Sequence, residues 1–132
     1  MSASAVMQPV AESISAKRIV IATIFGLIAG GLCASAAFQF GILKFAPLTL
    51  AFVLLNRAVM GFAIGVSGLR LHWAWHGILM GIVVGSIFSF YLFLNIGGAL
   101  PLMNALANGI FGLLIEFFTS VVFKQPPLRP FR

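Results

Sequence analysis

Two charged side chains lie inside stretches that are otherwise apolar, and any chemistry in this chain would begin with them. Arg57 follows Asn56 in the middle of one apolar run, and Glu116 lies near the end of another. A charge at the centre of a bilayer costs about 2.5–3.5 kcal/mol on insertion scales, so such residues are functional candidates. An arginine, which is always charged, would attract an anion. A buried carboxyl group without a cation could stay neutral and carry a proton.

The apolar run around Glu116 also carries polar or small residues at a spacing of four. Residues four apart share one face of a helix, so they form a continuous stripe. Lipid cannot satisfy the hydrogen-bonding groups of such a stripe, which must therefore face protein or water. The stripe consists of Asn104, Asn108, Gly112, Glu116 and Ser120.

The depths of these residues in the membrane predict which of them meet. Arg57 lies nine residues after the expected start of its helix, and Glu116 lies fifteen residues after the start of its own. Both helices run in the same direction, so the two charges differ in depth by about 9 Å. Asn108 is nearer the level of Arg57. We therefore expect Arg57 to meet Asn108, and also Asn104, more readily than Glu116 of its own chain.

Two interpretations of these polar residues remain open. They could line a path for a solute or for protons, or they could form structural pairs that fix the register of the helices or bind a partner subunit. The candidate path residues are Arg57, Glu116, Asn56, Asn104 and Asn108.

His72 and His76 form a second candidate site, because histidines four apart on one helical face can bind a metal, and a single one can ligate haem or chlorophyll. No Cys, Asp or Glu lies nearby in the sequence as a third ligand, and the chain lacks a C-x-x-C-H haem attachment motif. Both imidazoles would also suit a membrane interface. We therefore expect no metal and no cofactor, and keep the two histidines only as alternative ligands.

The sequence contains no signature of an enzyme. No nucleophile–base pair, phosphate-binding glycine loop or pair of carboxylates is recognisable, and the glycines inside apolar runs do not follow a strand as a dinucleotide fingerprint requires. We expect a protein that is not an enzyme.

The elements that hold these residues are predicted to be four membrane-spanning helices in a compact all-α bundle. Apolar residues make up 61% of the chain and charged residues only 8%, against about a quarter in soluble domains. Four apolar runs, at about 19–40, 48–69, 73–93 and 101–123, are each long enough to cross roughly 30 Å of hydrocarbon. They form a transmembrane domain of residues 17–124, between a flexible tail (1–16) and a Pro/Arg-rich tail (125–132).

Glycines at a spacing of four predict close packing of these helices with right-handed crossings. The packing positions are Gly26, Gly30, Gly61, Gly65, Gly77, Gly81 and Gly85. An offset of 51 residues pairs Gly26 with Gly77 and Gly61 with Gly112. This leaves open whether the chain consists of two repeated helical hairpins.

The basic residues predict the orientation in the membrane. Basic residues gather on the cytoplasmic side of a membrane. The side that holds the second turn and both termini would carry six basic residues, and the opposite side only Lys44, so both termini are expected in the cytoplasm. The six are Lys17, Arg18, Arg70, Lys124, Arg129 and Arg132. We expect an integral protein of a bacterial inner membrane. Its net charge of +6 suits lipid headgroups, and we expect no binding of nucleic acid. A cleaved secretory signal ending near Ala34-Ser35-Ala36 is the alternative interpretation of the first run.

A bundle of four helices has little interior in which to hide a polar stripe. We therefore expect association with the lipid bilayer and with copies of the chain or other membrane subunits. The predicted function is a transport or permeation component for a small solute or protons that acts as an oligomer. The alternative is a non-catalytic accessory or assembly subunit of a larger membrane complex.

Overall fold

The computed structural model describes residues 14–44 and 46–128, and these residues fold into helices without strands. The helices are α2 (Ala16–Gln39), α3 (Pro47–Val66), α4 (Trp73–Asn95) and α5 (Leu100–Phe117). A π-helical segment, η1 (Phe118–Val122), continues α5. Within the described ranges, four helices are long and apolar enough to span a membrane. The chain is an all-helical integral membrane protein.

The helix boundaries follow from local sequence. The Ser15 hydroxyl accepts a hydrogen bond from the Arg18 backbone N–H and caps α2. Pro47 begins α3, where its missing N–H would have no partner in any case. Gly97 and Gly98 take positive φ values of 71° and 68° in the turn between α4 and α5, a conformation that glycine adopts without strain.

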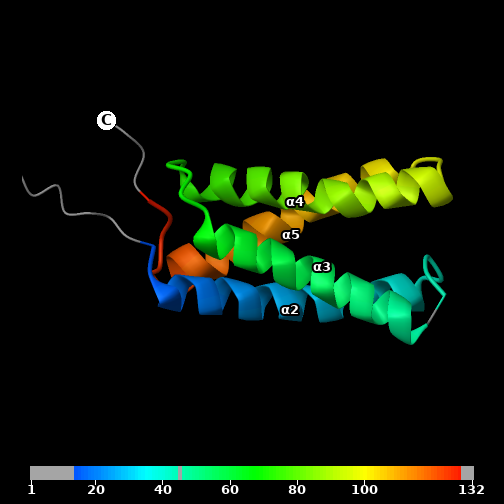
Figure 1. The fold of residues 1–132 in the computed structure, drawn as a ribbon, viewed down its shortest axis with the longest axis horizontal. Helices are drawn as coiled ribbons and strands as arrows, with labels where there is room; N and C mark the ends of the chain where they lie inside the picture. Colours follow the sequence, from blue (N-terminus) through cyan, green and yellow to red (C-terminus); the bar gives the residue numbers. More distant parts are fainter. Residues whose placement is uncertain (1–13, 45, 129–132) are drawn as a thin grey trace, which may run out of the picture.

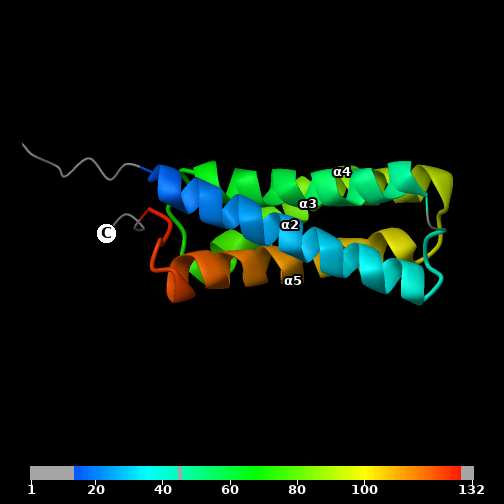
Figure 2. The same ribbon diagram turned by 90° about the horizontal axis from the view of Figure 1, so that it is seen from below.

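The four helices form two antiparallel hairpins, α2–α3 and α4–α5, which pack side by side (Figures 1 and 2). The packing within each hairpin is far more extensive than the packing between the hairpins. The start of α2 and the end of η1 lie at the same end of the bundle, which we call the terminal end. The turns 40–46 and 96–99 lie at the opposite end, which we call the loop end.

Glycines allow the two backbones of each hairpin to touch. In the first hairpin, a Cβ added at Gly26 would collide with the backbone carbonyl oxygen of Arg57. In the second, a Cβ added at Gly81 would collide with the carbonyl oxygen of Asn108. Gly31, on another face of α2, has no such neighbour within 4 Å. At every glycine predicted to pack, an added Cβ would lie within 3.1 Å of a backbone or side-chain atom of the neighbouring helix. These glycines are Gly26, Gly30, Gly61, Gly65, Gly77, Gly81 and Gly85.

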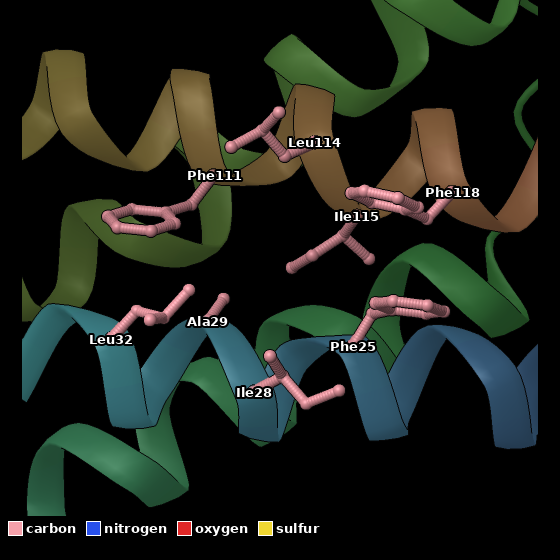
Figure 3. A pocket seen from close by; sticks show the side chains of 8 residues that line it. All are labelled: Phe25, Ile28, Ala29, Leu32, Phe111, Leu114, Ile115 and Phe118. Carbon is pink, nitrogen blue, oxygen red and sulfur yellow. The ribbon is translucent and has the colours of Figure 1, made fainter.

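The outer surface of the bundle is apolar, as a lipid-facing surface must be. Large hydrophobic side chains such as Leu32, Phe90 and Leu106 are more than half exposed. A shallow groove of about 70 Å³ runs between α2 and α5, and Phe25 and Phe118 stack across it with ring centroids 4.9 Å apart (Figure 3). Its lining is wholly hydrophobic, so acyl chains can fill it. The lining residues are Phe25, Ile28, Ala29, Leu32, Phe111, Leu114, Ile115 and Phe118.

The helices differ in extent from the expected spans mainly at two places. α3 ends at Val66 rather than near residue 69, because Ser67 turns to an extended conformation (ψ 126°) and its hydroxyl accepts the Leu69 N–H. α2 begins at Ala16, three residues before the expected span. Most of the two predicted tails, residues 1–13 and 129–132, lies outside the described residues.

Candidate functional site

The buried polar side chains form two clusters at different depths in the bundle. The terminal cluster, near the terminal end, consists of Arg18, His76, Glu116 and Ser120. The central cluster consists of Arg57 and Asn108 with Cys33 and Phe111 against them. Glu116 and Asn108 are two turns apart on α5, so the clusters are about 12 Å apart along the helix.

The terminal cluster is built around an ion pair. Arg18 Nη2 lies 2.9 Å from the carboxylate oxygens of Glu116, and the two side chains are 3% and 0% exposed. Ser120 donates its hydroxyl to the same carboxylate from one turn further along. His76 Nδ1 lies 2.8 Å from the other carboxylate oxygen. The negative charge of Glu116 is therefore both neutralised and hydrogen-bonded, which a buried carboxylate requires.

Arg18 also joins the start of α2 to the segment after η1. Its Nη1 donates to the backbone carbonyl oxygen of Gln125 at 2.5 Å, and its Nη2 donates to that of Ile64 at 3.1 Å. The Ser15 hydroxyl donates to the Gln125 side chain at 2.8 Å. Contacts with α3, α5 and the segment after η1 thus converge on one guanidinium group in the first turn of α2. These bonds hold α2, α3 and α5 together at the terminal end of the bundle.

The central cluster contains a buried cation without a counter-charge. Arg57 is 2% exposed and donates through Nη1 to the side-chain oxygen of Asn108. Its Nη2 lies 3.5 Å from Cys33 Sγ, and its guanidinium lies 4.7 Å from the ring centroid of Phe111. All these partners are neutral. Among the described residues the only carboxylate side chain is Glu116, which pairs with Arg18.

A cavity of about 290 Å³ opens between the two hairpins in the loop-end half of the bundle. Its wall includes Cys33 and Phe111, the two residues that also touch Arg57. Asn104 is a polar group of this wall, and its Nδ2 donates to Ser89 Oγ at 2.8 Å. A second cavity of about 390 Å³ between α3 and α4 shares part of this wall. Arg57 and Asn108 themselves do not line this cavity; they lie behind Cys33 and Phe111, and apart from Cys33 and Asn104 the wall is apolar.

Three buried polar atoms have no hydrogen-bonding partner among the described residues: Arg18 Nε, His76 Nε2 and Asn108 Nδ2. Such atoms are costly and uncommon in folded proteins. Two of them belong to the terminal cluster and one to the central cluster. Both clusters therefore have hydrogen-bonding capacity that this conformation does not use.

The expectation that Arg57 meets Asn108 rather than Glu116 is confirmed. The polar stripe on the last span faces protein, as expected, with Asn108 and Glu116 0% exposed. Asn104, however, bonds Ser89 rather than Arg57. Asn56 is half-buried, and within the part of the chain that the structure describes no hydrogen bond links it to either cluster.

Two sequence-based expectations at the terminal end are wrong. Arg18 was expected among the lipid headgroups, but α2 begins early enough for its first turn to direct Arg18 inward to Glu116. His76 was expected at the interface without a carboxylate nearby, but it is fully buried and contacts Glu116 from a distant part of the chain. Only His72 is exposed, where it caps α4. A cation within a turn of a helix start, opposite a carboxylate near a helix end, is the signal that could have indicated the pair.

The residues of the two clusters offer little to a metal ion. The described residues contain no group of three or more His, Cys, Asp or Glu side chains that could hold one. His76 and Glu116 are a pair, and the cation beside them is Arg18. The imidazole of the terminal cluster belongs to a residue type that can carry protons in proteins, and the guanidinium of the central cluster to one that can bind anions.

Comparison with known proteins finds no matching family model, no matching curated protein and no matching solved structure.

Proposed function

We propose that the chain is a non-enzymatic transport or permeation component for a small solute or protons, which acts as an oligomer in a bacterial inner membrane. The observation that carries this proposal is the contrast between the two kinds of helix contact. Backbones touch at glycines within each hairpin, whereas polar bridges and a cavity lie between the hairpins. Two rigid units around a polar site can rock against each other to open the site alternately to either side.

The glycine contacts support an internal repeat with a change of register. In the first hairpin Gly26 meets Arg57, and in the second Gly81 meets Asn108. Gly61 meets Ala22 in the first hairpin, and Gly112 meets Gly77 in the second. On this basis Gly26 corresponds to Gly81, one helical turn beyond the partner that a uniform offset of 51 assigns. The turn 40–46 is three residues longer than the turn 96–99, which accommodates most of this four-residue difference.

In this repeat, Arg57 and Asn108 occupy equivalent positions and also touch each other. An approximate two-fold axis relating the hairpins would then pass between them. In transporters built from parallel repeats, substrates bind near the middle of the membrane at the repeat interface. The central cluster has this location, and the small-residue rows favour right-handed crossings within each hairpin.

The terminal cluster would act as the gate in such a path. In the conformation described here, Arg18 and Glu116 bind the two hairpins together at the terminal end, while the cavity lies towards the loop end. A proton added to Glu116 would remove the charge that holds Arg18. His76 could supply it by passing the proton on Nδ1 to the carboxylate while its unused Nε2 takes up another proton. We place the termini in the cytoplasm, so the gate would lie on that side.

The second candidate is an accessory or assembly subunit, and the full pairing of Glu116 favours it. A carboxylate that already has a cation and a hydroxyl donor is suited to fixing the register of α2 against α5. In that case copies of other membrane polypeptides would be needed for activity.

Proton flux into proteoliposomes tests the proposal. Purified protein is reconstituted in liposomes that contain a pH-sensitive dye, and a potassium gradient with valinomycin supplies the driving force. We expect wild-type protein to acidify the lumen severalfold faster than empty liposomes. Glu116→Gln should return the rate to the empty-liposome value, because the carboxyl group that takes the proton is gone.

Ser86→Ala is the matched control, since Ser86 is exposed to lipid and bonds only its own helix backbone. It should conduct as the wild type does. A wild-type rate equal to that of empty liposomes would overturn the proton arm of the proposal. If gentle extraction then also yields other polypeptides in a fixed ratio, the accessory-subunit function holds instead.

A further inference from the structure

We propose that the central cluster binds a small organic monoanion, with its carboxylate on Arg57 and its apolar body in the adjoining cavity. This inference rests on the proposed transport function for its biological meaning and on the site geometry for its chemistry. It names the class of solute that the path would take.

The charge of Arg57 is the first step. A buried guanidinium is expensive to keep unless an anion compensates it. Arg18, the other arginine that is almost fully buried, has Glu116 at 2.9 Å. Arg57 has only an amide oxygen, a thiol and an aromatic face among the described residues. An anion at this position would supply the missing counter-charge.

The contact with Cys33 indicates where the anion would bind. A thiol sulfur is a weak hydrogen-bond acceptor, and Arg57 Nη2 lies 3.5 Å from it. A carboxylate oxygen in that place would make a shorter, charge-assisted hydrogen bond, and a guanidinium can bind both carboxylate oxygens at once. Because Cys33 belongs to the cavity wall, an anion reaching the guanidinium at this point would come from the cavity.

The cavity wall determines the rest of the solute. Apart from Cys33 and Asn104, it is built from aliphatic and aromatic side chains, including Leu92, Met103 and Phe111. An apolar cavity of about 150 Å³ is enough to hold benzene. The cavity here, at about 290 Å³, has room for a ring or short aliphatic chain together with a carboxylate. An inorganic anion such as chloride would leave the apolar wall without a partner.

Ligand-dependent stabilisation in detergent solution tests the site with benzoate as the probe. The unfolding midpoint of the full chain is measured against benzoate, benzyl alcohol and chloride, and the benzoate dissociation constant is measured by calorimetry. We expect benzoate to raise the midpoint, and the neutral isostere and chloride to leave it unchanged. Arg57→Met should weaken benzoate binding by about tenfold to a hundredfold, as the loss of hydrogen bonds to a charged group predicts.

Two matched variants identify the contribution of the charge at this position. Arg57→Lys keeps a cation and should retain part of the affinity. Lys44→Gln removes an exposed cation at the loop end, towards which the cavity lies, and should retain all of it. Folded wild-type protein that ignores benzoate overturns the inference. Equal stabilisation by benzyl alcohol overturns the role of Arg57, and equal stabilisation by chloride overturns the solute class.

Failure of this inference can be distinguished from failure of the proposed function. If benzoate does not bind but Glu116-dependent proton flux persists, the transport function stands and the solute class is wrong. If benzoate binds through Arg57 but neither benzoate nor protons cross the membrane, the site stands and the transport function is wrong.

Discussion

Arg18 and Arg57 are both almost fully buried, yet among the described residues only Arg18 meets a group of opposite charge. Arg18 is joined to a carboxylate on α5, a hydroxyl on η1 and two backbone carbonyl groups, one on α3 and one in the segment after η1. Arg57 meets one amide oxygen, one thiol and one aromatic ring. The charge of the first arginine is compensated within the described chain, and that of the second is not. Burial alone therefore does not distinguish the two arginines; the compensation of the charge does.

The largest effect should come from breaking the terminal cluster. Arg18→Met removes the arginine that pairs with Glu116 and leaves the carbonyl oxygens of Ile64 and Gln125 without their donor. Removing one partner of a buried ion pair costs about 3–5 kcal/mol. We expect a correspondingly lower unfolding midpoint in detergent, measured by denaturant titration or heating. Adding Glu116→Gln should restore part of the loss, since the uncompensated negative charge disappears.

Lys17→Ala is the control for this prediction, because Lys17 is the exposed neighbour of Arg18. Its unfolding midpoint should match that of the wild type. An Arg18→Met protein as stable as the wild type would mean that the ion pair does not hold the bundle together.

A change of opposite sign is expected at the central cluster. Arg57→Met removes a cation that costs about 2.5–3.5 kcal/mol to keep in a membrane interior, but it also leaves the Asn108 oxygen unpaired, which costs about 1–3 kcal/mol. The free energy of unfolding should therefore change by between about −0.5 and +2.5 kcal/mol. A loss similar to that of Arg18→Met would show that the two arginines have the same structural role.

The smallest effects are expected from removing single hydrogen bonds, one inside the terminal cluster and one outside both clusters. Ser120→Ala removes a hydroxyl that donates to Glu116 and accepts from Arg18, and should cost about 1.5–3 kcal/mol because both partners are charged. Asn104→Ala removes a half-buried bond to Ser89 between neutral groups and should cost only about 0.5–1 kcal/mol. Parallel measurements of the unfolding free energy check the order. The reverse order would mean that the terminal cluster does not stabilise the bundle more than its surroundings do.

The sequence was sufficient to predict the architecture and the central contact. Hydrophobic runs of about 20 residues define spans because of the thickness of the bilayer, and the depth of a residue follows from its distance along its helix. Arg57 and Asn108 belong to helices that run in the same direction, so their depths could be compared directly. The rise per residue gives these two side chains similar depths in the membrane, and this similarity predicted their contact.

The terminal cluster could not be predicted in the same way. Arg18 and His76 lie within the first turn of their helices, where a shift of one or two residues in the boundary decides between headgroup and interior. Rotation about the helix axis then decides whether the side chain points to lipid or to protein. Tertiary packing sets that rotation, and the net hydrophobic pattern of nearly uniform apolar helices carries little information about it.

Because the ion pair between Arg18 and Glu116 joins α2 to α5, the protein cannot form it until α5 has been synthesised. Arg18 precedes Glu116 by 98 residues, which a ribosome adds in roughly 5–20 s. During that interval the carboxylate that pairs with Arg18 in the folded chain has not yet been made, so α2 must wait for α5 before its buried arginine is compensated.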